Sequence, residues 1–177
     1  MDKFAYLGMG ITGMAVLLFA YKAATIALAI WYELAYPGFC ARVHGLYTAR
    51  KRLSLVVGLV NSIFFFIIVG VLFSVEGGGL AIPGFTVIGI YAALSVAAYG
   101  AAYRDLGQRL DAGELEFAPV RALIRGGILV EIAFLVPLYG QAMSLYTLFR
   151  GLGAVIIALL TQRRHARAAR SLGSPED

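Results

Sequence analysis

The chain has 177 residues, of which 60% are apolar and 14% charged, and its formal net charge is +5. A soluble domain carries about a quarter charged residues, so this composition excludes an ordinary water-soluble domain and indicates a membrane protein. The single cysteine, Cys40, excludes an intrachain disulfide, an iron–sulfur cluster and an all-cysteine zinc site. The two histidines, His44 and His165, lie in charged segments, which argues against an intramembrane haem.

Long apolar runs bounded by charge, proline or glycine predict five membrane-spanning helices, because a crossing helix needs about 20 apolar residues. We expect these spans at residues 4–34, 53–75, 82–103, 122–141 and 144–162, with a basic cytoplasmic tail at 163–177. The last two spans come from one apolar stretch, which we expect to fold back at Pro137, Gly140 and Gln141. Backbone amides in lipid must be paired within the chain, so these runs predict an all-α transmembrane helical bundle forming a single domain over 1–162.

Basic residues predict the orientation of this bundle. They gather after the first span, after the third span and in the tail: Arg42, Arg50, Lys51 and Arg52; Arg104, Arg109 and Arg121; Arg163, Arg164, Arg167 and Arg170. With five spans, all three clusters fall on one face. Because lysine and arginine are in excess on the cytoplasmic side, we expect the N-terminus outside and the C-terminus inside, in a plasma or inner membrane.

Small residues predict where the helices touch. Gly89, Ala93, Ala97 and Ala101 recur every fourth position in the third span, a pattern that lets helix backbones approach closely in lipid. We therefore expect this face to pack inside the bundle or against another subunit. The segment from Gly8 to Gly13 matches G-x-G-x-x-G, but a dinucleotide site also needs a preceding strand, so we interpret these glycines as helix packing.

Three ionisable residues inside the spans are the candidate functional site. A charged side chain at the bilayer centre costs about 2.5 to 3.5 kcal/mol and needs a partner. Lys22 and Glu131 fall at comparable depths, which predicts an ion pair, and Arg150 is the rival partner of Glu131. Such a pair either fixes the register of the helices or lines a polar path on which Glu131 exchanges a proton or binds a cation.

Other polar residues give weaker signals. Cys40 and His44 are four residues apart, but they have no third ligand nearby, so we expect no metal site and no cofactor. The tail arginines Arg163, Arg164, Arg167 and Arg170 are expected to contact anionic lipid headgroups. The basic residues lack a fold that would present them to nucleic acid.

No reaction motif stands out, and the function is therefore predicted from architecture. The leading hypothesis is an accessory or structural subunit of a larger membrane complex, whose partners are the bilayer and other subunits or further copies of itself. One alternative is a small oligomeric channel or transporter with a charged path through Lys22, Glu131 and Arg150. A second alternative is a membrane-embedded lipid-modifying enzyme.

Overall fold

The computed structural model describes residues 2–74, 81–110 and 119–172, with side chains described at 13–14, 16–74, 82–110 and 120–162, and nearly all of these residues are helical. The elements are α1 (Asp2–Ala35), α2 (Pro37–Ala49), α3 (Lys51–Ser74), α4 (Ala81–Leu110), α5 (Pro119–Phe134) and α6 (Tyr139–Leu172). No strand occurs in these ranges, which confirms the all-α prediction. The helix α6 continues to Leu172, so the first ten residues of the predicted tail belong to it.

In the part of the chain whose side chains are described, four helical segments are long and apolar enough to cross a membrane: Val16–Ala35, Lys51–Ser74, Ile82–Leu110 and Tyr139–Gln162. The predicted span at 122–141 is not one continuous helix, because α5 has only 16 residues. That length gives a rise of about 24 Å, less than a hydrocarbon core of about 30 Å. The chain breaks after Phe134, close to the predicted breaking point at Pro137.

The turn between α5 and α6 keeps its backbone hydrogen-bonded, as a turn near lipid requires. The amides of Leu135 and Val136 donate to carbonyls in the last turn of α5, and the Gly140 amide donates to the Val136 carbonyl at 2.8 Å. Pro137 cannot donate and so does not extend α5. Leu138 then adopts a φ of 60°, which reverses the chain into α6.

We expect the replacement Leu138→Gly to stabilise this turn. A left-handed backbone costs a side-chain-bearing residue about 1 to 2 kcal/mol, and Leu138 is 87% exposed, so its side chain contributes little packing in return. The unfolding free energy in mixed micelles should therefore rise by about 1 kcal/mol. The matched variant Val136→Gly, at an exposed position with ordinary φ, should give no gain. Equal effects of the two variants would contradict this reading of the turn.

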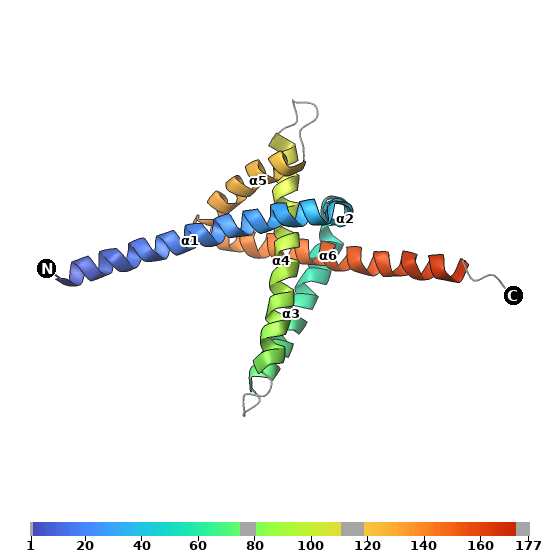
Figure 1. Cartoon of the computed structure of the whole chain (residues 1–177), viewed down its shortest axis with the longest axis horizontal. Coiled ribbons are helices and arrows are strands. Elements are labelled where there is room, and N and C mark those ends of the chain that lie inside the picture. Colours follow the sequence, from blue (N-terminus) through green and yellow to red (C-terminus); the bar gives the residue numbers. More distant parts are fainter. Residues whose placement is uncertain (1, 75–80, 111–118, 173–177) are drawn as a thin grey trace.

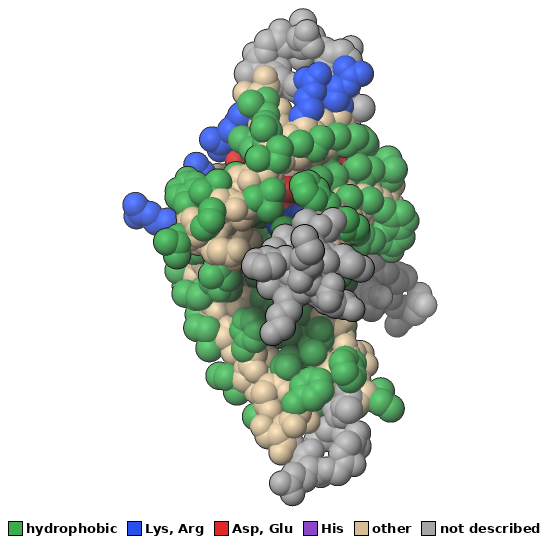
Figure 2. Space-filling view, turned by 90° about the vertical axis from the view of Figure 1, so that its left-hand side faces the viewer, with side chains coloured by type: hydrophobic (Ala, Val, Ile, Leu, Met, Phe, Trp, Pro, Cys, Tyr) green, Lys and Arg blue, Asp and Glu red, His purple; other side chains and the backbone are tan. Residues whose placement is uncertain are grey.

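The helices cross instead of lying side by side as parallel rods. In Figure 1, α1 and α6 run horizontally, whereas α4 runs vertically past the centre and α3 runs from near the centre down to the lower end of α4. The face in Figure 2 is mainly hydrophobic, and its lysine and arginine side chains gather in the upper part. The core lies where the two helix directions meet, around the fully buried side chains of Leu152 and Val155 on α6.

The helices α3 and α6 meet through two glycines. A Cβ on Gly58 would collide with the backbone carbonyl of Phe149, and a Cβ on Gly153 would collide with that of Ser54. Each glycine therefore lies against the backbone of the other helix, at a carbonyl that precedes that helix's own glycine by one helical turn. This reciprocal contact is the close backbone approach that small residues permit in lipid.

Candidate functional site

The candidate site is a buried charge cluster formed by α1, α4 and α5. The ammonium of Lys22 lies 2.5 Å from Oε2 of Glu131, and the Tyr103 hydroxyl donates a hydrogen bond to Oε1 of the same carboxylate. Glu131 is only 7% exposed. The Lys22 ammonium also lies 5.3 Å from the centre of the Phe134 ring. The structure thus brings Lys22 and Glu131 together and adds Tyr103, which the sequence analysis did not include.

Two glycines between α4 and α5 position this cluster. A Cβ on Gly126 would collide with the Tyr103 carbonyl, and a Cβ on Gly107 would collide with the Ala122 carbonyl. This arrangement repeats the reciprocal contact between α3 and α6. Because the two backbones touch, the Tyr103 side chain reaches the carboxylate of Glu131, which lies five residues after Gly126 on α5.

A second buried ion pair joins α1 to α4, and it was missed in the sequence analysis. Nη1 of Arg104 lies 2.6 Å from Oε1 of Glu33, and Glu33 is buried. The sequence analysis used Arg104 only to predict the orientation of the bundle and did not consider Glu33. The sequence did contain a signal for this second pair. Glu33 follows Lys22 on α1, and Arg104 directly follows Tyr103 on α4.

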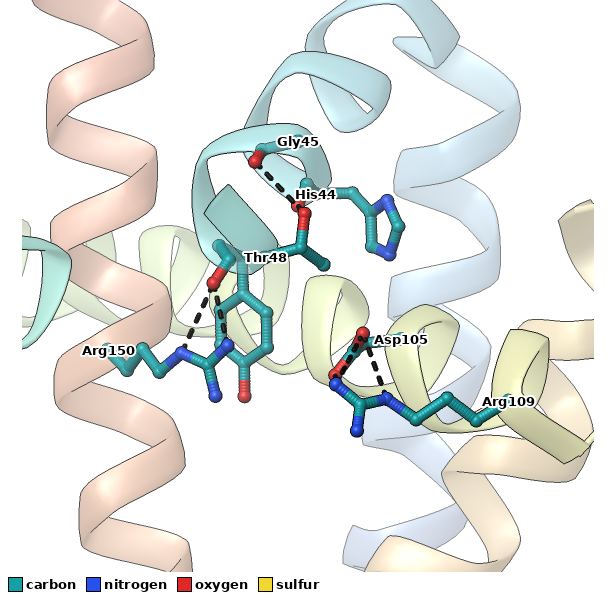
Figure 3. A network of polar contacts seen from close by, with 7 residues as sticks. His44, Gly45, Thr48, Asp105, Arg109 and Arg150 are labelled. Carbon is teal, nitrogen blue, oxygen red and sulfur yellow. Dashed lines mark hydrogen bonds and ion pairs between the residues drawn. The ribbon is translucent and has the colours of Figure 1, made fainter. Parts of the chain in front are cut away.

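Arg150 is not part of the Lys22–Glu131 cluster. Its Nε and Nη2 atoms donate to the Tyr47 carbonyl, at 3.2 and 2.7 Å, and its guanidinium lies 3.8 Å from the centre of the Tyr47 ring (Figure 3). Tyr47 is near the C-terminal end of α2, where backbone carbonyls lack helical partners and carry partial negative charge. Arg150 therefore supplies hydrogen-bond donors to a backbone carbonyl at the end of α2 that has no helical partner. Within the described ranges, no carboxylate forms an ion pair with it.

The other polar residues of this region lie between α2 and α4. In Figure 3, His44 projects from α2 on the side away from Arg150, and Asp105 pairs with Arg109 along α4 at 3.1 Å. Burial and the nearby Arg104 charge lower the pKa of His44, which keeps its ring neutral. Among the described residues, no group of three or more potential ligands could hold a metal ion.

Cys40 is predicted to be a slowly reacting thiol. Burial, together with the nearby Glu33 carboxylate, raises its pKa to about 11. Because the thiolate is the reactive form, alkylation by N-ethylmaleimide at pH 8 should be about a hundredfold slower than for an ordinary cysteine with a pKa near 8.5. Mass spectrometry of timed samples measures this rate. The control Cys40→Ala/Ala49→Cys places a thiol at an exposed position of the same helix and should react at the ordinary rate; similar rates would refute the prediction.

Only part of the small-residue face of α4 packs inside the molecule. Ala97 and Ala101 are buried in the core, whereas Gly89 and Ala93 are exposed. A further small contact, between Gly151 of α6 and Ala98 of α4, holds the middle of α4 in place. The predicted headgroup contacts concern side chains outside the described residues: Arg163, Arg164, Arg167 and Arg170.

A pocket of about 250 Å³ lies between α1 and α5, and Lys22 and Glu131 are among its lining residues. Its other walls are apolar side chains, including Leu18, Phe19, Ile128 and Ile132. The Lys22 side chain is 21% exposed. The arrangement can hold a small apolar group next to a neutralised charge pair. No protein-family model, curated protein or solved structure matches the chain.

Proposed function

We propose that the chain is an integral membrane subunit that packs against another membrane protein through the exposed part of the α4 small-residue face, which is Gly89 and Ala93. The observation that carries this proposal is the split of that face, because Ala97 and Ala101 are buried whereas Gly89 and Ala93 are exposed. A Cβ on Gly89 would meet no atom within 4 Å. The exposed half therefore has room for the backbone of a further helix.

The internal charges support a structural role for the chain. Lys22 pairs with Glu131 and Arg104 pairs with Glu33, each at hydrogen-bonding distance. Removing one member of a buried pair is strongly destabilising, whereas an intact pair mainly specifies which helices lie together. Both pairs involve α1, so they fix α1 against α4 and α5.

The test enlarges the exposed small residues. The variants Gly89→Leu and Ala93→Leu should abolish association in native membranes and leave the fold intact, as monitored by circular dichroism. The matched control is Gly70→Leu, where a Cβ on α3 also meets nothing, and this variant should keep the complex. Chemical crosslinking and native mass spectrometry provide the readout. A wild-type chain that is extracted as a lone monomer, or variants that retain full association, would refute the proposal.

We also propose that the N-terminus is outside and the C-terminus inside a plasma or inner membrane, with α5 as a short fifth crossing. What supports this topology is the position of the helix ends in Figure 1. When the bilayer normal runs from lower left to upper right in Figure 1, the start of α1 lies on one side of the membrane, together with the end of α3 and the start of α4. The end of α6 and the α4–α5 end, which carry basic residues, lie on the other side.

Helix length agrees with such oblique crossings. The helices α1 and α6 have 34 residues each and α4 has 30, which corresponds to about 45 to 51 Å. Long spans fit a thinner hydrocarbon core by tilting. Reporter fusions after residue 76 and after residue 177 test the topology, since a periplasmic reporter should be active only at the first site and a cytoplasmic reporter only at the second. Four crossings would instead put the C-terminus outside.

A small channel or transporter is the second candidate, favoured by the partial exposure of the Lys22 side chain beside its buried partner Glu131. Arg150 bonds to Tyr47 and is not part of this candidate path. In proteoliposomes, Glu131→Gln should abolish a proton or cation flux if the pair carries one. An unchanged flux, or a wild-type chain without flux, would refute this candidate and leave the subunit proposal standing.

A further inference from the structure

The middle of α3 carries a polar side chain without a partner, the amide of Asn61. This residue follows Lys51, the first residue of α3, by about 15 Å of helix rise, which is half of a hydrocarbon core of about 30 Å. Elsewhere on α3, the Ser62 hydroxyl accepts a hydrogen bond from Tyr91. Within the described part of the chain, the Asn61 amide forms no hydrogen bond at all.

The Asn61 amide is accessible from outside the bundle. The residue is partly exposed, and among the described side chains neither of its polar atoms belongs to the buried atoms that lack a partner. Because the amide oxygen and nitrogen are both unbonded, both must reach the surface. Asn61 lines a groove of about 420 Å³ between α3 and α6, whose other lining residues are all apolar: Val56, Val57, Val60, Phe64 and Ile156.

Lipid cannot satisfy an amide at this depth. Neither water nor ester carbonyls occupy the centre of the hydrocarbon core, and an unpaired polar group there is costly. Asparagine side chains in membrane proteins form hydrogen bonds between helices for this reason. Asn61 therefore gains from a helix that brings another polar group to the same depth.

A second copy of the chain meets this requirement by symmetry. A carboxamide has two donors and one acceptor oxygen, so two amides can bond reciprocally. Two copies inserted in the same direction have Asn61 at the same depth, and a two-fold axis along the membrane normal brings the two amides together. Val60 and Phe64, which flank the amide, are 62% and 61% exposed, so they can pack against the other copy.

We propose that α3 forms the contact between two copies of this chain, with the Asn61 amides hydrogen-bonded to each other across the two-fold axis. Gly70 lies nine residues further along α3, about 180° around the helix, and is outside this contact. The exposed Gly89 and Ala93 are on another helix, α4. This contact is thus distinct from the one proposed above for another membrane protein.

The first experiment measures energy transfer between donor-labelled and acceptor-labelled copies of the purified full chain in liposomes, as lipid is added. Asn61→Leu should weaken self-association about tenfold. Asn61→Gln keeps the amide and should retain most of the affinity. Transfer in the wild type that does not exceed random mixing, or equal association of Asn61→Leu and the wild type, would overturn the proposal.

Two controls separate this contact from the fold and from the proposed function. Asn61→Leu removes no hydrogen bond among the described residues, so its circular dichroism should match that of the wild type. Gly89→Leu should leave self-association unchanged, and a loss equal to that of Asn61→Leu would contradict a contact through α3. A chain that pairs with itself but has no other partner in native membranes would refute the proposed function alone.

The second experiment leaves Asn61 unchanged and maps the contact by disulfide formation in liposomes with copper phenanthroline. In a Cys40→Ala background, Phe64→Cys should crosslink two copies at least fivefold faster than Phe66→Cys. The two phenylalanines are 61% and 64% exposed, but Phe66 lies about 200° further around α3 than Phe64. Equal crosslinking rates would overturn the contact.

Discussion

Replacing Gly153 by alanine is expected to lower the unfolding free energy by about 3 kcal/mol. Overpacking of a tight contact typically costs about 1 to 3 kcal/mol, and here the new Cβ would collide with the Ser54 backbone carbonyl, which has no rotamer to change. The helices α3 and α6 must therefore separate, which loosens the contacts around Leu152. Reversible unfolding in dodecylmaltoside and SDS mixtures, followed by the fluorescence of the single tryptophan, Trp31, measures the loss.

The control for this prediction is Gly70→Ala on α3, where a Cβ meets nothing within 4 Å. Alanine is a better helix former than glycine by about 1 kcal/mol, so this variant should be neutral or stabilised. Gly58→Ala, at the opposite side of the contact, should behave like Gly153→Ala. Because both changes separate the same two helices, the double variant should lose less unfolding free energy than the two single variants lose together. If Gly58, Gly70 and Gly153 respond alike, the reciprocal contact does not exist.

Replacing Lys22 by methionine is expected to cost about 3 to 5 kcal/mol of folding free energy, the usual cost of leaving one member of a buried ion pair alone. The Glu131 carboxylate would keep only the Tyr103 hydroxyl as a donor, in a site where it is 7% exposed. The double variant Lys22→Met/Glu131→Gln should recover most of the loss, because glutamine is neutral and still accepts the hydrogen bond from Tyr103.

Arg109→Ala is the matched control for the charge pair. Its partner Asp105 is on the same helix, and the Arg109 side chain is 60% exposed, so the loss should stay below about 0.5 kcal/mol. The same mixed-micelle unfolding assay applies to all three variants. A double variant that is no more stable than Lys22→Met would show that the charges are not coupled.

The sequence was sufficient to predict the helical class and most helix positions, because long apolar runs in lipid leave few alternatives to a helix. It also placed Lys22 and Glu131 at similar depth, and the structure has them in contact. Depth could not separate Lys22 from Arg150 as the partner of Glu131. That choice depends on which face of α6 meets α2, where Arg150 bonds to the Tyr47 carbonyl.

The close helix contacts could not be predicted from spacing alone. The sequence pattern pointed to Gly89, Ala93, Ala97 and Ala101, of which only the last two are buried. The tightest backbone contacts are instead at Gly58, Gly107 and Gly153. Each of these glycines contacts a helix far away in the sequence or across a connection. Which glycine meets which backbone is decided by the relative placement of two helices, and a periodic pattern within one helix contains no information about it.

The shortness of α5 has a consequence for the surrounding lipids. In the proposed topology, its 16 residues cross a layer that the neighbouring helices cross with 20 or more. Lipid molecules next to α5 must therefore compress or spread laterally so that the polar ends of that helix stay solvated. This local deformation is least costly with short or unsaturated fatty acids, and the protein should accordingly enrich them on that side.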